Sequence, residues 1–423
     1  RLIQIDGEEA EIPNGKKADV LVKDLGSRPF VIQKIEKKDK NRNPLPPFIT
    51  SKLQQDAARK LRYSPKRTMM LAQQLYEGIE MGAEGPVGLI TYMRTDSPRV
   101  SDEALTEVRG FIREQFGSDY LPQKPNLYKT KKKAQDAHEA IRPTSSLRTP
   151  ESIKKFLTRD HYLLYKLIWD RFVASQMNPA KLEMTRVDIE AGNMLFRANG
   201  QVVKFKGFTV LYTESQDDKK EEKKGDSPAG KAEAEGERTL PELEEGQTLN
   251  LLGLDPKQHF TQPPPRFTEA LLIKDLEDKG IGRPSTYHSI LSTIVDREYV
   301  EKEEGRLKPT DLGKVVNELL VQHFPEVLNV AFTARMETEL DEIEDGEKPW
   351  VETVRQFYET YNKNLSKAQK EMRDVKREEI PTDIVCEKCE KNMVIKWGRH
   401  GRFLACPGYP DCRNKTEFVE EEG

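Results

Sequence analysis

Residues 88–97 read Gly88-Leu89-Ile90-Thr91-Tyr92-Met93-Arg94-Thr95-Asp96-Ser97, and this stretch decides how the rest of the chain is interpreted. A tyrosine between apolar neighbours is by default a partly buried core residue with a hydrogen-bonded hydroxyl. This stretch is unusually polar for a core strand, however, and turn residues stand at both of its ends. In an extended segment Arg94 lies on the same face as Tyr92, two residues away. The stretch therefore predicts a reactive tyrosine beside a cation, with a core tyrosine as the alternative.

A tyrosine and an arginine on one face suit the transfer of a phosphoryl group. A phenol has a pKa near ~10 and attacks poorly at neutral pH unless cations stabilise the phenolate and the charge that develops at phosphorus. A guanidinium group can grip two phosphate oxygens at once. A phosphotyrosine would also conserve the energy of the phosphodiester bond, so that resealing would need no ATP. Tyr92 and Arg94 are therefore candidate catalytic residues.

The length of 423 residues predicts two to four domains, and the composition argues against a membrane protein. The chain is 36% hydrophobic, and no apolar run approaches the ~18 residues that would suggest a membrane span. The net charge of −3 conceals an acidic segment, because residues 214–245 hold 12 acidic and 6 basic residues and leave a net of +3 elsewhere. We interpret residues 213–246 as an acidic flexible loop. The chain opens at Arg1 with no methionine or secretory leader, so we expect it to be part of a longer protein.

Hydrophobic periodicity predicts a helical block between two β-rich blocks. The predicted strands lie at 17–36, 182–190, 194–198, 202–212 and 247–252. The predicted helices lie at 51–63, from 64 onward, 101–116, 150–158 and 160–176. Strands on both sides can pair in one sheet only if the helical block is inserted into it. We therefore expect a discontinuous β (arch) domain of residues 1–50 and 179–254, which carries an inserted, mainly helical domain of residues 51–178.

Residues 255–378 have the pattern of a winged-helix-like DNA-binding domain followed by a long helix. Thr268 is expected to cap a helix that stops at Gly280, and Ser285 is expected to cap a second helix. A hairpin signal around 303–305 follows. A plain helical hairpin with a β extension is the alternative. Residues 353–376 predict a long, charged, amphipathic helix.

Residues 380–423 contain every cysteine of the chain, in the spacing Cys386-x2-Cys389-x16-Cys406-x5-Cys412. Two cysteine pairs on short knuckles can surround one tetrahedral zinc ion and leave no open position, so the spacing predicts a structural zinc ribbon. Clustered cysteines also indicate a reducing cytoplasm. The aromatic and cationic residues between the pairs suit stacking on bases and pairing with phosphates, although the rings could instead form the core of the module. These residues are Trp397, Arg399, Arg402 and Phe403.

The stretch around Tyr92 resembles the active-site signature of type IA DNA topoisomerases. Four further stretches resemble the same family in the same order: 136–143, 171–177, 264–287 and 332–337. With the four-cysteine ribbon, the resemblance covers the chain from about residue 44 to its end and implies the bacterial topoisomerase I branch. It implies an α+β multidomain fold: the toroidal core of the family, with a discontinuous β domain, an inserted helical catalytic domain, a winged-helix-like domain and a C-terminal zinc ribbon.

The resemblance implies a role for individual residues. Tyr92 would be the nucleophile that takes the 5′ phosphate, Arg94 would hold the scissile phosphate, and His138 would order the site from the opposite wall. The residues implied to contact DNA are Arg94, Arg142, Arg266, Thr268, Arg283 and Ser285.

The implied activity is ATP-independent relaxation of negatively supercoiled DNA through single-strand cleavage, strand passage and religation. The magnesium ligands of the family lie in a toprim domain, and this chain has no Asp-x-Asp run, so we expect the 423 residues alone to be inactive. Expected partners are single-stranded DNA and negatively supercoiled duplex, with no membrane. We expect a monomer in the cytoplasm, associated with the nucleoid, and contact with RNA polymerase through further C-terminal modules.

Two other function classes compete with this interpretation. A non-catalytic protein that binds single-stranded DNA through a winged helix and a zinc ribbon would explain residues 266–422. It would leave 88–97 and 134–143 without a reason. A tyrosine recombinase or a phosphodiesterase would need sets of arginine and histidine around the tyrosine that the sequence does not contain.

Overall fold

The structure, a computed structural model, describes residues 1–129, 138–213, 240–375, 377–398 and 401–418. The chain divides into two compact units, each of which is described by itself. The first comprises Arg1–Arg62 and Met70–Pro265, and the second comprises Tyr63–Met69 and Arg266–Gly423. In the described part of the chain, none of the helices has the length and apolar character that crossing a membrane requires.

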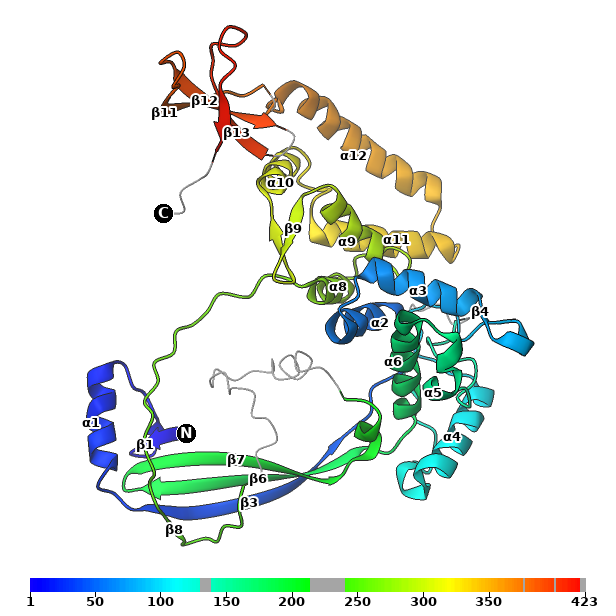
Figure 1. The fold of residues 1–423 in the computed structure, drawn as a ribbon, viewed down its shortest axis with the longest axis vertical. Coiled ribbons are helices and arrows are strands. Elements are labelled where there is room, and N and C mark those ends of the chain that lie inside the picture. The colour runs from blue at the N-terminus through cyan, green and yellow to red at the C-terminus, as the bar shows by residue number, and fades with distance from the viewer. Residues whose placement is uncertain (130–137, 214–239, 376, 399–400, 419–423) are drawn as a thin grey trace. The chain divides into compact units, whose positions relative to one another are not determined.

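The first unit is built on a six-stranded antiparallel sheet with the strand order β2-β1-β7-β6-β3-β8. Its strands are β1 Leu2–Ile5, β2 Glu8–Glu9, β3 Phe30–Arg42, β6 Ala180–Ala191, β7 Met194–Phe205 and β8 Thr248–Leu249. The long strands β3, β6 and β7 lie side by side, as Figure 1 shows. Strands from the beginning of the chain thus pair with strands from beyond residue 179, and the helices between β3 and β6 form an insertion in the sheet.

The strand predicted over 17–36 is wrong in its first half, which forms helix α1 Gly15–Leu25. The side chain of Asn14 caps this helix by accepting a hydrogen bond from the Lys17 amide at 3.0 Å. Leu21 and Leu25, four residues apart, are buried against the sheet, whereas Val20 is 63% exposed. The apolar and polar residues that alternate around Val20 and Val22 therefore belong to an amphipathic helix, not to a strand.

The strand predicted over 202–212 is also too long, because β7 ends at Phe205 and a 3-10 turn, η5 Gly207–Val210, follows. Gly207 has a φ of +49°, and a Cβ there would meet the Asn178 and Pro179 carbonyl oxygens at 2.5 Å. This close approach leaves no space for a side chain, so only glycine fits at this position. The positive φ of Gly207 lets the chain turn out of the sheet here.

The insertion between β3 and β6 contains the remaining helices of the first unit and helix α3, whose residues up to Met69 belong to the second unit. The helices are α2 Thr50–Asp56, the π-helical turn η1 Ala57–Leu61, α3 Pro65–Glu77, α4 Asp102–Phe116, α5 Pro150–Ile153 and α6 Arg159–Ser175. The short elements are β4 Ile79–Glu80, η2 Gly82–Glu84, β5 Pro86–Val87, η3 Ser118–Tyr120 and η4 Lys154–Phe156. Leu164, Ile168 and Val173 place one face of α6 in the core, as its apolar periodicity predicts.

The second unit begins with the predicted helix–turn–helix–hairpin order. Its elements are α8 Glu269–Asp278, α9 Tyr287–Asp296, β9 Val300–Glu303, β10 Arg306–Pro309, α10 Asp311–His323, α11 Val330–Glu344 and α12 Trp350–Glu371. The long helix predicted over 353–376 thus begins and ends a few residues earlier. Thr268 caps α8 as expected, by accepting from the Leu271 amide at 3.2 Å. Ser285 is not the N-cap of α9, because that position belongs to Thr286. The Thr286 hydroxyl accepts from the Arg283 amide at 2.8 Å and closes the turn one residue later than predicted.

Four antiparallel strands form the end of the chain in the order β11-β12-β13-β14. They are β11 Ile380–Val385, β12 Asn392–Gly398, β13 Gly401–Ala405 and β14 Lys415–Glu417. The core of this small sheet contains Met393, Ile395 and Leu404 together with the buried thiols of Cys386 and Cys406.

A buried ionic cluster connects the helices of the insertion to the chain that leaves the sheet. Asp56 accepts a hydrogen bond from the Tyr212 hydroxyl and faces the Lys60 ammonium at 3.7 Å and the Arg171 guanidinium at 3.9 Å. Arg171 also donates from Nε to the Pro46 carbonyl at 2.6 Å. Burial and the Asp56 carboxylate raise the pKa of Tyr212, so the hydroxyl stays protonated and acts as a donor.

Replacing Asp56 with asparagine is expected to lower the free energy of unfolding by about 3 kcal/mol, because it leaves two cations facing a neutral side chain in a buried site. Tyr212→Phe, which removes one hydrogen bond and no charge, should cost about 1–2 kcal/mol. Denaturant unfolding of both variants measures the difference. An Asp56→Asn variant as stable as the parent would show that the cluster does not stabilise the unit.

Candidate active site and metal centre

The stretch that contains Tyr92 follows β5 and pairs with the loop at 138–144. The Thr91 amide donates to the Arg142 carbonyl at 2.9 Å, the Thr144 amide donates to the Leu89 carbonyl at 3.0 Å, and Ile90 and Pro143 form an isolated bridge. Leu89, Ile90 and Met93 are buried, so the backbone of the stretch belongs to the core. This pairing brings together two motifs that are about fifty residues apart in the sequence.

Two threonines clamp the backbone on either side of Tyr92. The Thr91 hydroxyl donates to the Ala140 carbonyl at 2.7 Å and accepts from the Arg142 amide at 3.0 Å. The Thr50 hydroxyl donates to the Met93 carbonyl at 2.8 Å and accepts from the Thr95 amide at 2.9 Å. Thr50 is buried at the start of α2, and its role was missed from the sequence. No local signal points to it, because its partners are more than forty residues away.

The side chain of Tyr92 is 38% exposed, which argues against the core alternative. Its ring lies 5.7 Å from the His138 ring and 5.4 Å from the Tyr76 ring, centroid to centroid. The structure thus brings Tyr92 and His138 together, as the resemblance implied. It also adds Tyr76, to which no motif in the sequence points.

Arg94 is half-buried, and its Nε atom is inaccessible to solvent with no hydrogen-bond partner among the described residues. A buried polar atom without a partner is costly, and the cost is larger for a charged group. An anion such as a phosphate oxygen would satisfy this donor. The residue type, its burial and its proximity in sequence to Tyr92 are what a phosphate clamp requires.

Arg142 is occupied by protein partners in this structure. Its guanidinium contacts the Glu139 carboxylate at 2.8 Å, the Pro143 carbonyl at 3.0 Å and the Ser101 hydroxyl at 3.4 Å. These contacts favour a role in holding the 138–144 loop, so its contact with DNA stays a prediction. Glu107 supports the end of the same loop.

Glu107 accepts hydrogen bonds from the Ser145 hydroxyl at 3.0 Å and from the Ser146 amide and hydroxyl at 2.5 and 2.7 Å. Burial of this carboxyl favours its neutral form, but the hydrogen bonds outweigh that effect and lower the pKa of Glu107. Glu107 is therefore a charged anchor at neutral pH.

The predicted DNA-contacting residues of the second unit differ in how they are held. Arg283 donates to Asp341 at 2.8 Å and lies 3.4 Å from Glu337. Partial burial opposes its charge, but the two carboxylates raise the pKa of Arg283. Arg266 and Ser285 are exposed, and Thr268 is used as the helix cap described above. Arg266 and Ser285 are thus the better placed of the four to meet a ligand.

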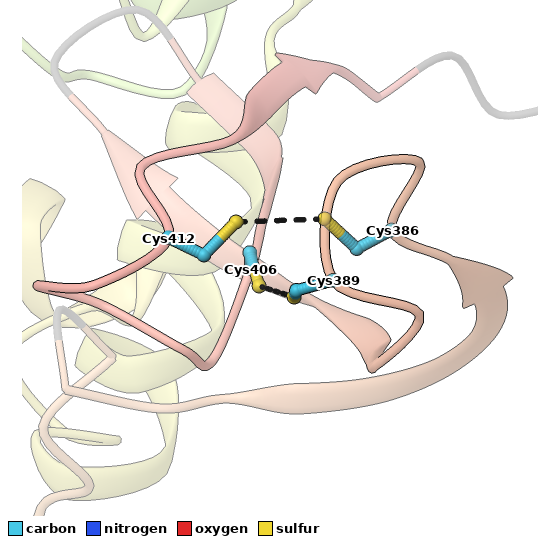
Figure 2. Close-up of side chains that lie close together, drawn as sticks. All are labelled: Cys386, Cys389, Cys406 and Cys412. Atoms are coloured by element: carbon cyan, nitrogen blue, oxygen red, sulfur yellow. Dashed lines mark hydrogen bonds between the residues drawn. The ribbon is translucent and has the colours of Figure 1, made fainter.

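The four cysteines converge on one point, as Figure 2 shows. All four sulfur atoms lie within 4.8 Å of one another, with 3.7 Å between Cys386 and Cys412 and 3.1 Å between Cys389 and Cys406. A zinc–sulfur distance of about 2.3 Å places the sulfurs of a tetrahedral site about 3.8 Å apart, so the arrangement fits a zinc ion. Among the described residues this is the single group of potential metal ligands.

The neighbours of the sulfurs support a metal site. The Asn414 side chain donates to the Cys386 sulfur at 3.4 Å, and the Gly408 amide donates to the Cys406 sulfur at 3.3 Å. A hydrogen bond from the Lys388 amide contributes most to lowering the pKa of Cys386 to about 6, whereas the Cys389 sulfur raises the pKa of Cys406 to about 12. Four adjacent thiolates repel one another, and a central cation is what would allow all of them to be deprotonated.

Comparison with known proteins gives the same result over nearly the whole chain. Residues 4–355 match the family model described as DNA topoisomerase, and residues 383–421 match the model described as topoisomerase DNA binding C4 zinc finger. The chain is also similar to the solved full-length topoisomerase I from Thermotoga maritima, with 35% sequence identity and a TM-score of 0.76. The chain belongs to the bacterial type IA DNA topoisomerases.

The similarity covers 99% of this chain and 64% of the Thermotoga maritima topoisomerase, so the chain spans less than two thirds of that relative's length. Within the topoisomerase family, the match to the zinc-finger model and the sulfur geometry identify Cys386, Cys389, Cys406 and Cys412 as a structural zinc site.

The surface of this topoisomerase zinc ribbon carries an aromatic–cation pair. Trp397 on β12 is paired in register with Arg402 on β13, and the Arg402 guanidinium lies 5.2 Å from the Trp397 ring. Phe403 and Trp397 are partly exposed, and neither is among the residues that form the ribbon's core. This disfavours the interpretation that the two rings are the core. Arg399 lies outside the described residues.

Proposed function

We propose that this chain supplies the nucleophilic and DNA-binding part of an enzyme that relaxes negatively supercoiled DNA without ATP. The observation that carries the proposal is the half-exposed Tyr92, in a stretch clamped by two threonines and followed by an arginine whose buried Nε has no partner. Such an arrangement exposes one phenol at a fixed position and provides a donor for an anion beside it.

In the proposed reaction the Tyr92 hydroxyl gives up its proton and its oxygen forms a bond to the scissile phosphorus. The bond from phosphorus to the 3′ oxygen breaks, and the 3′ oxygen takes up a proton. The product is a 5′-phosphotyrosine and a free 3′-hydroxyl. Arg94 would hold the non-bridging phosphate oxygens, and His138 would order the site. After passage of the other strand, attack by the 3′-hydroxyl reverses the step and reseals the DNA.

The described residues contain no carboxylate cluster that fits a magnesium ion. We propose that magnesium, which would offset charge on the phosphate, is held by a toprim domain outside these 423 residues. A monomer located at the nucleoid in the cytoplasm is the state proposed for the enzyme. Contact with RNA polymerase is proposed for further C-terminal modules.

The experiment that tests this function uses the 423-residue chain with and without a separate toprim polypeptide. The chain alone, with magnesium and negatively supercoiled plasmid, should show no relaxation, and the mixture should show some. With an oligonucleotide labelled at its 3′ end, the label should become covalently attached to the chain, and peptide mass spectrometry should locate the adduct at Tyr92. Robust binding of single strands without any adduct in the mixture would instead favour a non-catalytic DNA-binding protein.

Single-stranded DNA is expected to bind this chain more tightly than a blunt duplex of the same length. Exposed bases can stack on Trp397 beside Arg402, whereas paired bases cannot. Trp397→Ala should weaken binding about 10-fold, and affinity should fall with rising salt because phosphate contacts release counterions. Fluorescence anisotropy at several salt concentrations measures both effects.

The matched control is Trp350→Ala, since Trp350 is 63% exposed on α12 and lies outside the ribbon. It should leave the affinity unchanged. Equal affinity for duplex and single strand would contradict the expected preference.

A further inference from the structure

The ring of Tyr92 has two aromatic neighbours among the described residues, His138 and Tyr76, and Tyr76 has no assigned role. The Tyr76 and Tyr92 rings meet edge to face, with centroids 5.4 Å apart and an interplanar angle of 66°. This is a favoured geometry for an aromatic pair. We propose that Tyr76 is a positioning residue that holds the Tyr92 ring in the orientation needed for attack on phosphorus. The inference rests on the function proposed above.

The backbone before Tyr92 is hydrogen-bonded to the backbone at the end of α3. The Leu89 amide donates to the Leu75 carbonyl at 2.7 Å, and Ile79 pairs with Val87 in the β4–β5 ladder. A Cβ at Gly88 would lie 2.8 Å from the Tyr76 carbonyl oxygen, so glycine is required for this approach. The last turn of α3 and the start of the Tyr92 stretch therefore form one fixed support.

The two residues that contact the Tyr92 ring belong to elements of different rigidity. His138 belongs to a loop, whereas Tyr76 belongs to a 13-residue helix whose neighbouring side chains Leu71, Ala72 and Leu75 are buried in the core. A helix anchored through several core side chains holds its surface residues more rigidly than a loop does. Tyr76 on helix α3 can therefore fix the orientation of the Tyr92 ring better than His138 can.

The Tyr76 ring, rather than its hydroxyl, makes the contact. The side chain is 40% exposed, and its hydroxyl makes no hydrogen bond to the described residues. A phenylalanine would therefore keep the support, and an alanine would remove it. Because the side chain is partly exposed, truncating it opens no large cavity in the core.

Orientation matters because in-line attack requires the phenol oxygen to approach phosphorus from one direction. Small misplacements of a reacting group can reduce a rate about 100-fold. A Tyr92 ring free to rotate away from Tyr76 would spend most of its time out of line. It would still bind DNA normally, because the arginines that contact DNA are unchanged.

The first test measures single-turnover formation of the covalent adduct by this chain supplemented with the toprim polypeptide. Tyr76→Ala should slow adduct formation about 10- to 100-fold without changing oligonucleotide affinity, and Tyr76→Phe should stay within about 2-fold of the parent. Met70→Ala, which truncates another exposed side chain of α3 (54% exposed), is the matched control and should have no effect. A Tyr76→Phe variant as slow as Tyr76→Ala would assign the role to the hydroxyl and overturn the proposal, as would full activity of Tyr76→Ala.

The second test does not depend on activity. With 3-fluorotyrosine incorporated at position 92 of the 423-residue chain, the ¹⁹F resonance should move toward that of the free amino acid in Tyr76→Ala and remain unchanged in Tyr76→Phe. Identical resonances in all variants would overturn the positioning role. If the unmodified enzyme formed no adduct, the proposed function would fall, while the ¹⁹F comparison would still decide whether Tyr76 fixes the ring.

Discussion

A Tyr92→Phe variant is expected to form no covalent adduct with DNA and to relax no plasmid, in the presence of the toprim polypeptide and magnesium. The substitution removes the oxygen that would attack phosphorus. The Tyr92 hydroxyl makes no hydrogen bond to the described residues, so folding and single-strand binding should be unchanged. Denaturing electrophoresis with a 3′-labelled oligonucleotide measures formation of the adduct, and fluorescence anisotropy measures binding.

An Arg94→Ala variant distinguishes the role of the nucleophile from the role of the residue that binds the phosphate. Loss of one donor to a developing charge typically costs about 100- to 1,000-fold in rate, so this variant should retain a slow reaction. Its adduct should still map to Tyr92. An adduct formed by Tyr92→Phe would show that another residue is the nucleophile and would remove the main support for the proposed function.

A Cys406→Ala variant is expected to lose zinc and to unfold residues 380–423, while the remainder of the chain stays folded. The core of the ribbon contains three apolar side chains and two of the metal-binding thiols, too few to hold four short strands without the ion. Zinc binding typically contributes on the order of 10 kcal/mol to the folding of such modules. Elemental analysis should fall from one zinc per chain to well under one, and hydrogen exchange of the ribbon should become fast.

Arg413→Ala is the matched control for the zinc site, because Arg413 follows a ligand and binds no described partner. It should retain one zinc and a folded ribbon. A Cys406→Ala protein that keeps both stoichiometric zinc and slow exchange in residues 380–418 would disprove the four-thiolate site. Treatment of the parent protein with a strong chelator should reproduce the unfolding.

The zinc site was predicted from sequence because its ligands come in two local pairs whose spacing itself constrains geometry. Strand β6 was also predicted, over 182–190, whereas the single strand β7 was predicted as two segments, 194–198 and 202–212. Helix α1 was misread because a few residues of an amphipathic helix can mimic alternation, and the cap at Asn14 went unused. The error shows that a capping signal can outweigh a short periodic pattern.

The Tyr92 site required more than periodicity. The proximity of His138 followed from the family resemblance, and no pattern in the sequence predicts the bridge between Ile90 and Pro143. Thr50, Tyr76 and Asn414 were missed for the same reason: each acts on a residue that is distant in the sequence or through a contact without a spacing rule. Tertiary packing, rather than local preference, determines such contacts.

The ends of the inserted helical segment meet at one rung of the sheet, because Arg42 at the end of β3 is the register partner of Ala180 at the start of β6. Residues 43–179 therefore form one long loop that leaves the sheet after Arg42 and returns to the neighbouring strand at Ala180. A two-residue turn could replace it and leave β3 and β6 as an ordinary hairpin. The long loop imposes little loop-closure entropy on the sheet, since that term grows only slowly with length. At this position of the sheet, a whole helical insertion could be exchanged for another without changing the order or pairing of the strands.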